Sequence, residues 1–86
     1  MHYEEIRQLT QQQPFEPFRI RLSNGETYDI THPEMLMIGR LALHIGVPGN
    51  DLPMGVFDKM RIVSMLHVAE VFPLSILQPH RNGADG

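Results

Sequence analysis

The sequence predicts a small α+β domain, mainly β, in which one N-terminal helix precedes five antiparallel strands that bend strongly or close into a small barrel. The 86 residues are enough for one domain and too few for two. Apolar and polar residues alternate in several short runs, which is typical of half-buried strands. Turn signals separate these runs closely, and short antiparallel strands with one buried face tend to curl because closure removes exposed edges.

The first element is a helix over residues 3–13. Tyr3, Ile6 and Leu9 recur at every third position and form one narrow apolar stripe. Pro14 ends the helix because a proline ring clashes with the preceding helical turn. A helix of this length is marginal alone, so we expect its stripe to dock on the sheet or at an interface.

The first two strands are predicted over residues 18–22 and 26–30. A two-residue loop at Asn24 and Gly25 would put Tyr28 on the face of the first strand that carries the arginines. A three-residue loop instead brings the apolar side chains of both strands to one face. We therefore predict a type I turn with a bulge, in which Gly25 has a positive φ.

Turn signals and three more strands follow this hairpin. Thr31 and Glu34 have the spacing of a capping box, which predicts a short helical turn over residues 35–38. The further strands are expected over residues 41–47, 56–65 and 67–72, with Leu66 at a corner before the last one.

The domain is expected to occupy residues 1–74, and the polar segment 75–86 is expected to be a disordered tail. The net charge of -3 gives no overall attraction to nucleic acid or to an anionic membrane. The first residues are acidic where a signal peptide is basic, and no apolar run approaches the roughly 18 residues that span a bilayer. We therefore expect a cytoplasmic protein with no membrane partner.

The residue types exclude several chemistries. Cysteine is absent, which excludes disulfides, thiol catalysis and thiolate metal sites. The histidines have no metal-ligand spacing, and we interpret His44 and His67 as half-exposed sheet residues rather than a joint metal site. No serine lies in a nucleophile motif. The expectation is a protein that is not an enzyme and has no metal or cofactor.

Four cations are the candidate functional residues. Arg19 and Arg21 share one face of the first strand, and Lys59 and Arg61 share one face of the fourth. If these strands are neighbours, the cations form one outer surface for nucleic acid or a protein partner. An ordinary charged face is the favoured interpretation, because no aromatic side chain lies beside the arginines for base stacking.

Residues 13–34, QPFEPFRIRLSNGETYDITHPE, resemble a family of small uncharacterised bacterial proteins common in planctomycete-type genomes. Its pattern is PFxPFRIxL, then Asp or Asn followed by Gly, then HPE, and later a strand ending like Val71-Phe72-Pro73-Leu74. The resemblance covers roughly residues 3–74 and implies boundaries but no established activity. The order of elements and Leu22-Ser23-Asn24-Gly25 are also similar to SH3- or Sm-like barrels, but HPE departs from the Sm pattern and no RNA-binding residue is carried over.

The functional expectation is a non-catalytic protein-interaction or structural module that self-associates, with Sm-like RNA binding as the alternative. Five of the six methionines lie between residues 35 and 65, and methionine lines adaptable partner surfaces. Open strand edges and the narrow helix also favour a homo-oligomer. We also expect a protein partner whose identity the sequence does not indicate.

Overall fold

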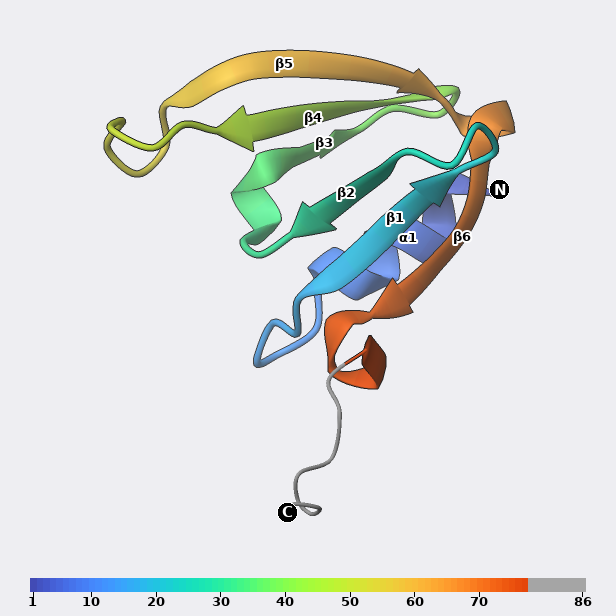
Figure 1. Ribbon diagram of the computed structural model, residues 1–86. Coiled ribbons are helices and arrows are strands. Elements are labelled where there is room, and N and C mark those ends of the chain that lie inside the picture. The colour runs from blue at the N-terminus through green and yellow to red at the C-terminus, as the bar shows by residue number, and fades with distance from the viewer. Residues whose placement is uncertain (78–86) are drawn as a thin grey trace.

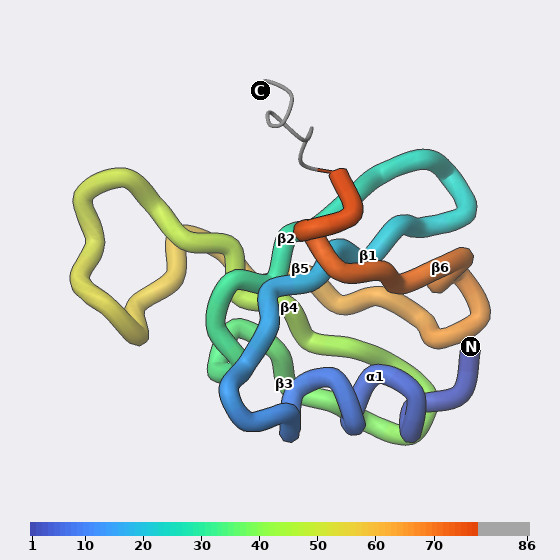
Figure 2. The backbone as a smooth tube through the Cα atoms, turned by 90° about the horizontal axis from the view of Figure 1, so that it is seen from below, coloured from blue at the N-terminus to red at the C-terminus, as the bar shows by residue number. Residues whose placement is uncertain are grey.

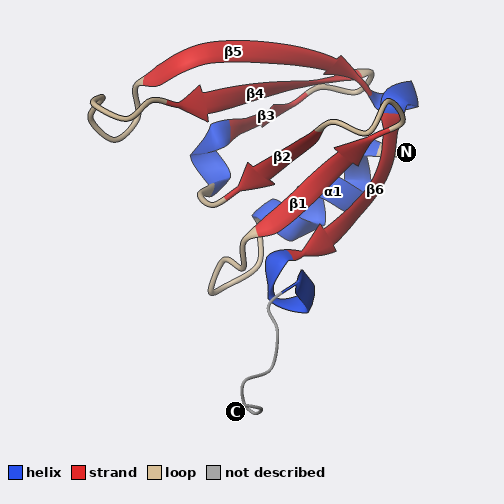
Figure 3. Ribbon diagram, viewed as in Figure 1, coloured by secondary structure: helices blue, strands red, loops and turns tan. Residues whose placement is uncertain are grey.

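The computed structural model of the protein describes residues 1–77 and confirms an α+β, mainly β fold within them. The helices are α1 (Tyr3–Thr10) and the short 3₁₀ helices η1 (Pro33–Met35), η2 (Met65–His67) and η3 (Leu74–Leu77). The strands are β1 (Phe18–Leu22), β2 (Thr27–Ile30), β3 (Leu36–Ile38), β4 (Ala42–Pro48), β5 (Phe57–Ser64) and β6 (Val68–Pro73) (Figures 1 and 3).

The strands form two antiparallel sheets of three strands each, in the orders β2-β1-β6 and β3-β4-β5. The expectation of a single five-stranded sheet or closed barrel is therefore wrong. Pro33 lacks the N–H group that a continuing strand would need, and η1 turns the chain between β2 and β3. On either side of this turn, β2 pairs with β1 and β3 pairs with β4. At the other corner η2 carries the chain from β5 to β6, near the position expected for Leu66 (Figure 1).

The segment after β2 also differs from the predicted helical turn. His32 rather than Thr31 is the N-cap of η1, and no side chain closes this cap. Thr31 Oγ1 instead donates to Met35 Sδ at 3.3 Å, so the capping box with Glu34 does not form. Residues 36–38 are extended because their pairing with β4 satisfies the backbone. That pairing is a long-range contact, which no local pattern reveals.

The β1–β2 hairpin has the predicted three-residue loop. The Leu22 N–H donates to the carbonyl oxygen of Glu26 at 2.8 Å, and Gly25 has φ +94°. Asn24 Oδ1 closes the turn by accepting the backbone N–H of Glu26 at 2.9 Å. In this register Tyr28 packs against the core, on the opposite side from the arginines of β1.

The core lies between the two sheets, and α1 covers it from one side (Figure 2). The buried residues come from every strand except β3 and from α1, η1 and η2; they are Ile6, Phe18, Ile20, Leu22, Ile30, Met35, Leu43, Ile45, Val63, Met65 and Val68. The helix ends at Thr10, earlier than predicted, because Gln11 already leaves the helical conformation. Its short length leaves Ile6 as the buried anchor of α1.

Two segments lie at the periphery of this core. The connection between β4 and β5, residues 49–56, stands away from the rest of the chain (Figure 2). Residues 75–77, expected in the tail, belong to η3, whose Leu74 N–H donates to the Pro17 carbonyl oxygen at 3.1 Å. The rest of the expected tail, 78–86, lies outside the described residues.

Candidate functional site

The four candidate cations lie on two strands that are not neighbours. Arg19 and Arg21 lie on β1, which pairs with β2 and β6. Lys59 and Arg61 lie on β5, which pairs with β4 in the other sheet. The strand adjacency required for one continuous cationic surface is therefore absent from the two sheets that residues 1–77 form.

The arginines of β1 are engaged by acidic side chains of the neighbouring strands. Arg19 donates from Nε and from its terminal nitrogen to the two carboxylate oxygens of Asp29, at 2.6 and 3.1 Å. This hydrogen bonding, together with the Asp29 charge, raises the pKa of Arg19 above its ordinary value. Arg21 forms an ion pair with Glu70 of β6 at 2.7 Å. The outer face of this sheet is thus a set of cross-strand ion pairs rather than a free cationic stripe.

Arg61 connects the two sheets instead of facing solvent alone. Its Nε donates to the Tyr28 hydroxyl at 2.9 Å, and a terminal nitrogen lies 3.8 Å from Glu26. The hydrogen bond to Tyr28, followed by electrostatic interaction with Tyr28 and Glu26, raises the pKa of Arg61. Lys59 lies two residues earlier on the same strand and has no ion pair among residues 1–77.

The two faces of β5 are reversed relative to the expectation of a cationic outer face. Val63 lies opposite Leu43 and is buried, so the residues two and four positions earlier, Arg61 and Lys59, share the inner side of the strand. Met60 and Ile62 consequently point outward. The sequence contained a signal for this orientation. Val63 and Met65 are apolar and follow Lys59 and Arg61 at alternate positions, whereas they do not alternate in step with Met60 and Ile62. The cations therefore share a face with the two apolar residues that follow them.

The reversal creates an exposed apolar face on the outer side of the β3-β4-β5 sheet. Met37, His44 and Ile62 lie side by side across its three strands. Their neighbour Met60 lies opposite Gly46, and the exposed fractions of Met37, Met60 and Ile62 are 68%, 55% and 70%. We refer to Met37, His44, Met60 and Ile62 as the apolar face. Single exposed apolar residues are ordinary, but clusters on adjacent strands mark interaction surfaces.

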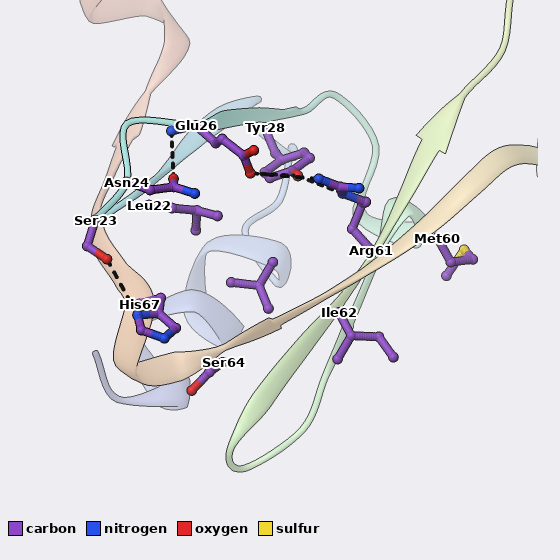
Figure 4. A pocket seen from close by; sticks show the side chains of 11 residues that line it. Leu22, Ser23, Asn24, Glu26, Tyr28, Met60, Arg61, Ile62, Ser64 and His67 are labelled. Carbon is purple, nitrogen blue, oxygen red and sulfur yellow. Dashed lines mark hydrogen bonds and ion pairs between the residues drawn. The ribbon is translucent and has the colours of Figure 1, made fainter.

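A groove of about 590 Å³ separates β5 from the β1–β2 turn. Residues 60–64 of β5 form one wall, and residues of the turn together with His67 form the other. Figure 4 shows Arg61 reaching across this groove to Tyr28. At its far end Ser23 Oγ lies 3.5 Å from His67 Nδ1, a pair that the sequence did not indicate.

The groove does not assemble a catalytic or metal-binding constellation from the described residues. The Ser23–His67 separation is at the outer limit of a hydrogen bond, and no carboxylate among residues 1–77 hydrogen-bonds His67. No three His, Asp or Glu side chains in this part of the chain are grouped to hold a metal ion. The lining of the groove offers apolar contact from Met60 and Ile62, the edge of β5 and one cation, Arg61.

Fold and site together define a small two-sheet domain with an exposed apolar face and an open strand. The chain matches no protein-family model, no curated protein and no solved structure. No helix within residues 1–77 is long and apolar enough to cross a membrane.

Proposed function

We propose that the protein is a non-catalytic protein-interaction module that self-associates through its apolar face. The observation that supports this is the exposure of Met37, Met60 and Ile62 on adjacent strands of one sheet. Water contact with such a cluster is unfavourable by about 25 cal/mol for each Å² of apolar surface, so covering it stabilises a complex.

A second copy of the chain is the partner that fits this face best. The apolar face carries no Lys, Arg, Asp or Glu, so two copies can approach without repulsion between like charges. Sheets pack face to face at about 10 Å when their facing side chains interdigitate. Methionine adapts to such packing because its side chain is unbranched and flexible. A two-fold arrangement would place the same side chains on both sides of the interface.

The test is the mass of the chain in solution as a function of concentration, by light scattering or sedimentation. We expect a mass above that of the monomer that rises with concentration for the unchanged protein. Met37→Lys and Ile62→Lys should each give a monomer, because both put a charge into the buried interface.

The matched control is Met54→Lys, which changes a 75% exposed methionine in the β4–β5 connection, outside the apolar face. This variant should associate as the unchanged protein does. A monomer at millimolar concentration, or equal association of Met37→Lys and Met54→Lys, would remove the proposed function. Circular dichroism spectra of all variants would establish that the fold is retained.

A further inference from the structure

Among residues 1–77, no strand pairs with one edge of β5. It pairs with β4 on one side only, because it is the last strand of its sheet. Its residues 58–62 are exposed on both faces, which leaves five consecutive residues of a strand in contact with water. Alternate backbone N–H and C=O groups of an edge strand point away from the sheet, where they are available to another extended chain.

The part of this edge formed by residues 60–64 borders the groove. Met60, Arg61 and Ile62 line one wall of the groove, and the β1–β2 turn lines the other. A segment lying there would be contacted by β5 through its backbone and by the turn through side chains. This is the geometry of strand addition, in which main-chain hydrogen bonds supply affinity and flanking side chains select the sequence.

Two cations lie on the inner side of β5, and of these Arg61 lines the groove. Arg61 has five N–H donors, of which Nε is used by Tyr28, while its distance of 3.8 Å to Glu26 is too long for a hydrogen bond. Lys59 lies on the same side of the strand, because side chains two residues apart share a face. Both cations are therefore available to carboxylates of an incoming segment.

A second copy of β5 brings like charges together at this edge when the two copies pair at Met60. In an antiparallel pair, residues directly opposite one another lie on the same face of the sheet. If Met60 pairs with Met60 of a second copy, Lys59 lies opposite Arg61 in both halves of the pair. Like charges directly opposite are destabilising. The same cations that protect the edge against self-pairing favour a strand with acidic residues in those positions.

We propose that the free edge of β5 binds an extended segment of a partner protein in which acidic and apolar residues alternate. The acidic side chains face the groove and meet Lys59 and Arg61. The apolar side chains lie beside Met60 and Ile62 and extend the apolar face by one strand. The inference rests on the proposed function, since it names a second partner of the same interaction module.

The test uses a synthetic eight-residue peptide of alternating valine and glutamate, labelled with a fluorophore, and measures its binding by fluorescence anisotropy. The expected result is saturable binding that weakens as salt is added, because the added contacts are ionic. A valine–lysine peptide of the same length should bind at least about tenfold more weakly. The valine–glutamate peptide with N-methyl groups on alternate amides should not bind, because strand addition needs those N–H groups.

Variants of the chain assign the binding to this edge. The double change Lys59→Glu and Arg61→Glu should reverse the preference and select the valine–lysine peptide. The milder pair Lys59→Gln and Arg61→Gln should remove the preference while leaving the fold unaltered. The matched control is Arg19→Gln with Arg21→Gln, which neutralises two cations of the other sheet and should leave peptide binding unchanged.

Three outcomes would overturn this inference: equal binding of both peptides by the unchanged protein, a preference for the valine–glutamate peptide that survives the Lys59 and Arg61 changes, or no binding of the valine–glutamate peptide at millimolar concentration. A change of oligomeric mass in the Lys59 and Arg61 variants without any effect on the peptide would identify a second copy as the occupant. Met37→Lys separates the two proposals, because it lies two strands from the open edge and should dissociate the oligomer while retaining the peptide.

Discussion

Gly25 sets the register of the first hairpin through its backbone conformation. Its φ of +94° is a region that residues with a Cβ rarely adopt, and no atom beyond the adjacent residues lies within 4 Å of where a Cβ would be. Any substitution at this position is therefore unfavourable because of the backbone conformation and not because of a steric clash. The register that this glycine permits places Tyr28 against the core and within reach of Arg61.

Replacing Gly25 tests this account. Gly25→Val should lower the free energy of unfolding by about 1–2 kcal/mol, because a β-branched residue is penalised at positive φ. Gly25→Asn should cost clearly less, since asparagine tolerates this region. Urea unfolding measures both changes. Equal stability of the valine variant and the unchanged protein would contradict a positive φ at this position.

Gly46 is required for a different reason, which is the close approach of an aromatic ring. A Cβ at this position would lie 2.6 Å from the ring of Phe57, which occupies the space above the glycine. Gly46→Ala should therefore destabilise the fold by about 1–3 kcal/mol, as overpacking does. The same change in a Phe57→Ala background should cost less, because the ring is gone. A double-mutant cycle in urea measures this coupling, and additive effects would refute the contact.

At the scale of elements, α1 is held by one buried side chain. Ile6 is fully buried, whereas Tyr3 and Leu9 pack only at the margin of the core. An eight-residue helix does not persist in water without such docking. Ile6→Ala should lower the free energy of unfolding by about 2–5 kcal/mol, measured by urea unfolding. The exposed neighbour Gln8→Ala serves as the control and should have little effect.

The ion pairs of β1 bear on the RNA-binding alternative. Arg19 and Arg21 are engaged by Asp29 and Glu70, so phosphate contacts would have to displace these carboxylates. We expect no shift of single-stranded RNA at low salt for the unchanged protein. Asp29→Asn with Glu70→Gln should increase affinity by freeing both arginines. Salt-sensitive binding by the unchanged protein, lost on Arg19→Glu with Arg21→Glu, would establish the RNA alternative.

Strand β5 shows how one element acquires two different surfaces. Its inner side ends in the buried Val63 and begins with the cations Lys59 and Arg61, which lie beyond the edge of the core. Its outer side carries Met60 and Ile62, which are both largely exposed. In the two proposals, this strand offers its apolar side chains to a second copy and its cations to an extended acidic segment.

At the scale of the whole molecule, the proposed self-association predicts that stability depends on protein concentration. The folded chain of the described residues buries eleven apolar side chains, and a covered apolar face would add to this core. Because the partner binds only the folded state, the thermal unfolding midpoint should rise with protein concentration. Met37→Lys should remove this dependence and Met54→Lys should preserve it. Scanning calorimetry at several concentrations checks the prediction, and a constant midpoint for the unchanged protein would contradict it.

Local patterns in the sequence determined the helix start, the β1–β2 register, the long strands β4 and β5 and the corner at Leu66. Each depends on neighbours along the chain: a stripe of period three, a glycine at a bend, or apolar and polar alternation. The sequence alone also excluded thiol chemistry, because cysteine is absent, and it contains no serine in a nucleophile motif.

Only the tertiary structure decided how these elements pair and which surfaces they leave open. Residues 36–38 became a strand because β4 lies beside them, and the break at η1 divided one expected sheet into two. The outward direction of Met60 and Ile62 followed from the pairing of Val63 with Leu43. Such pairings join residues far apart in the chain, and their free energy depends on what the opposite strand buries, which no local window of sequence contains.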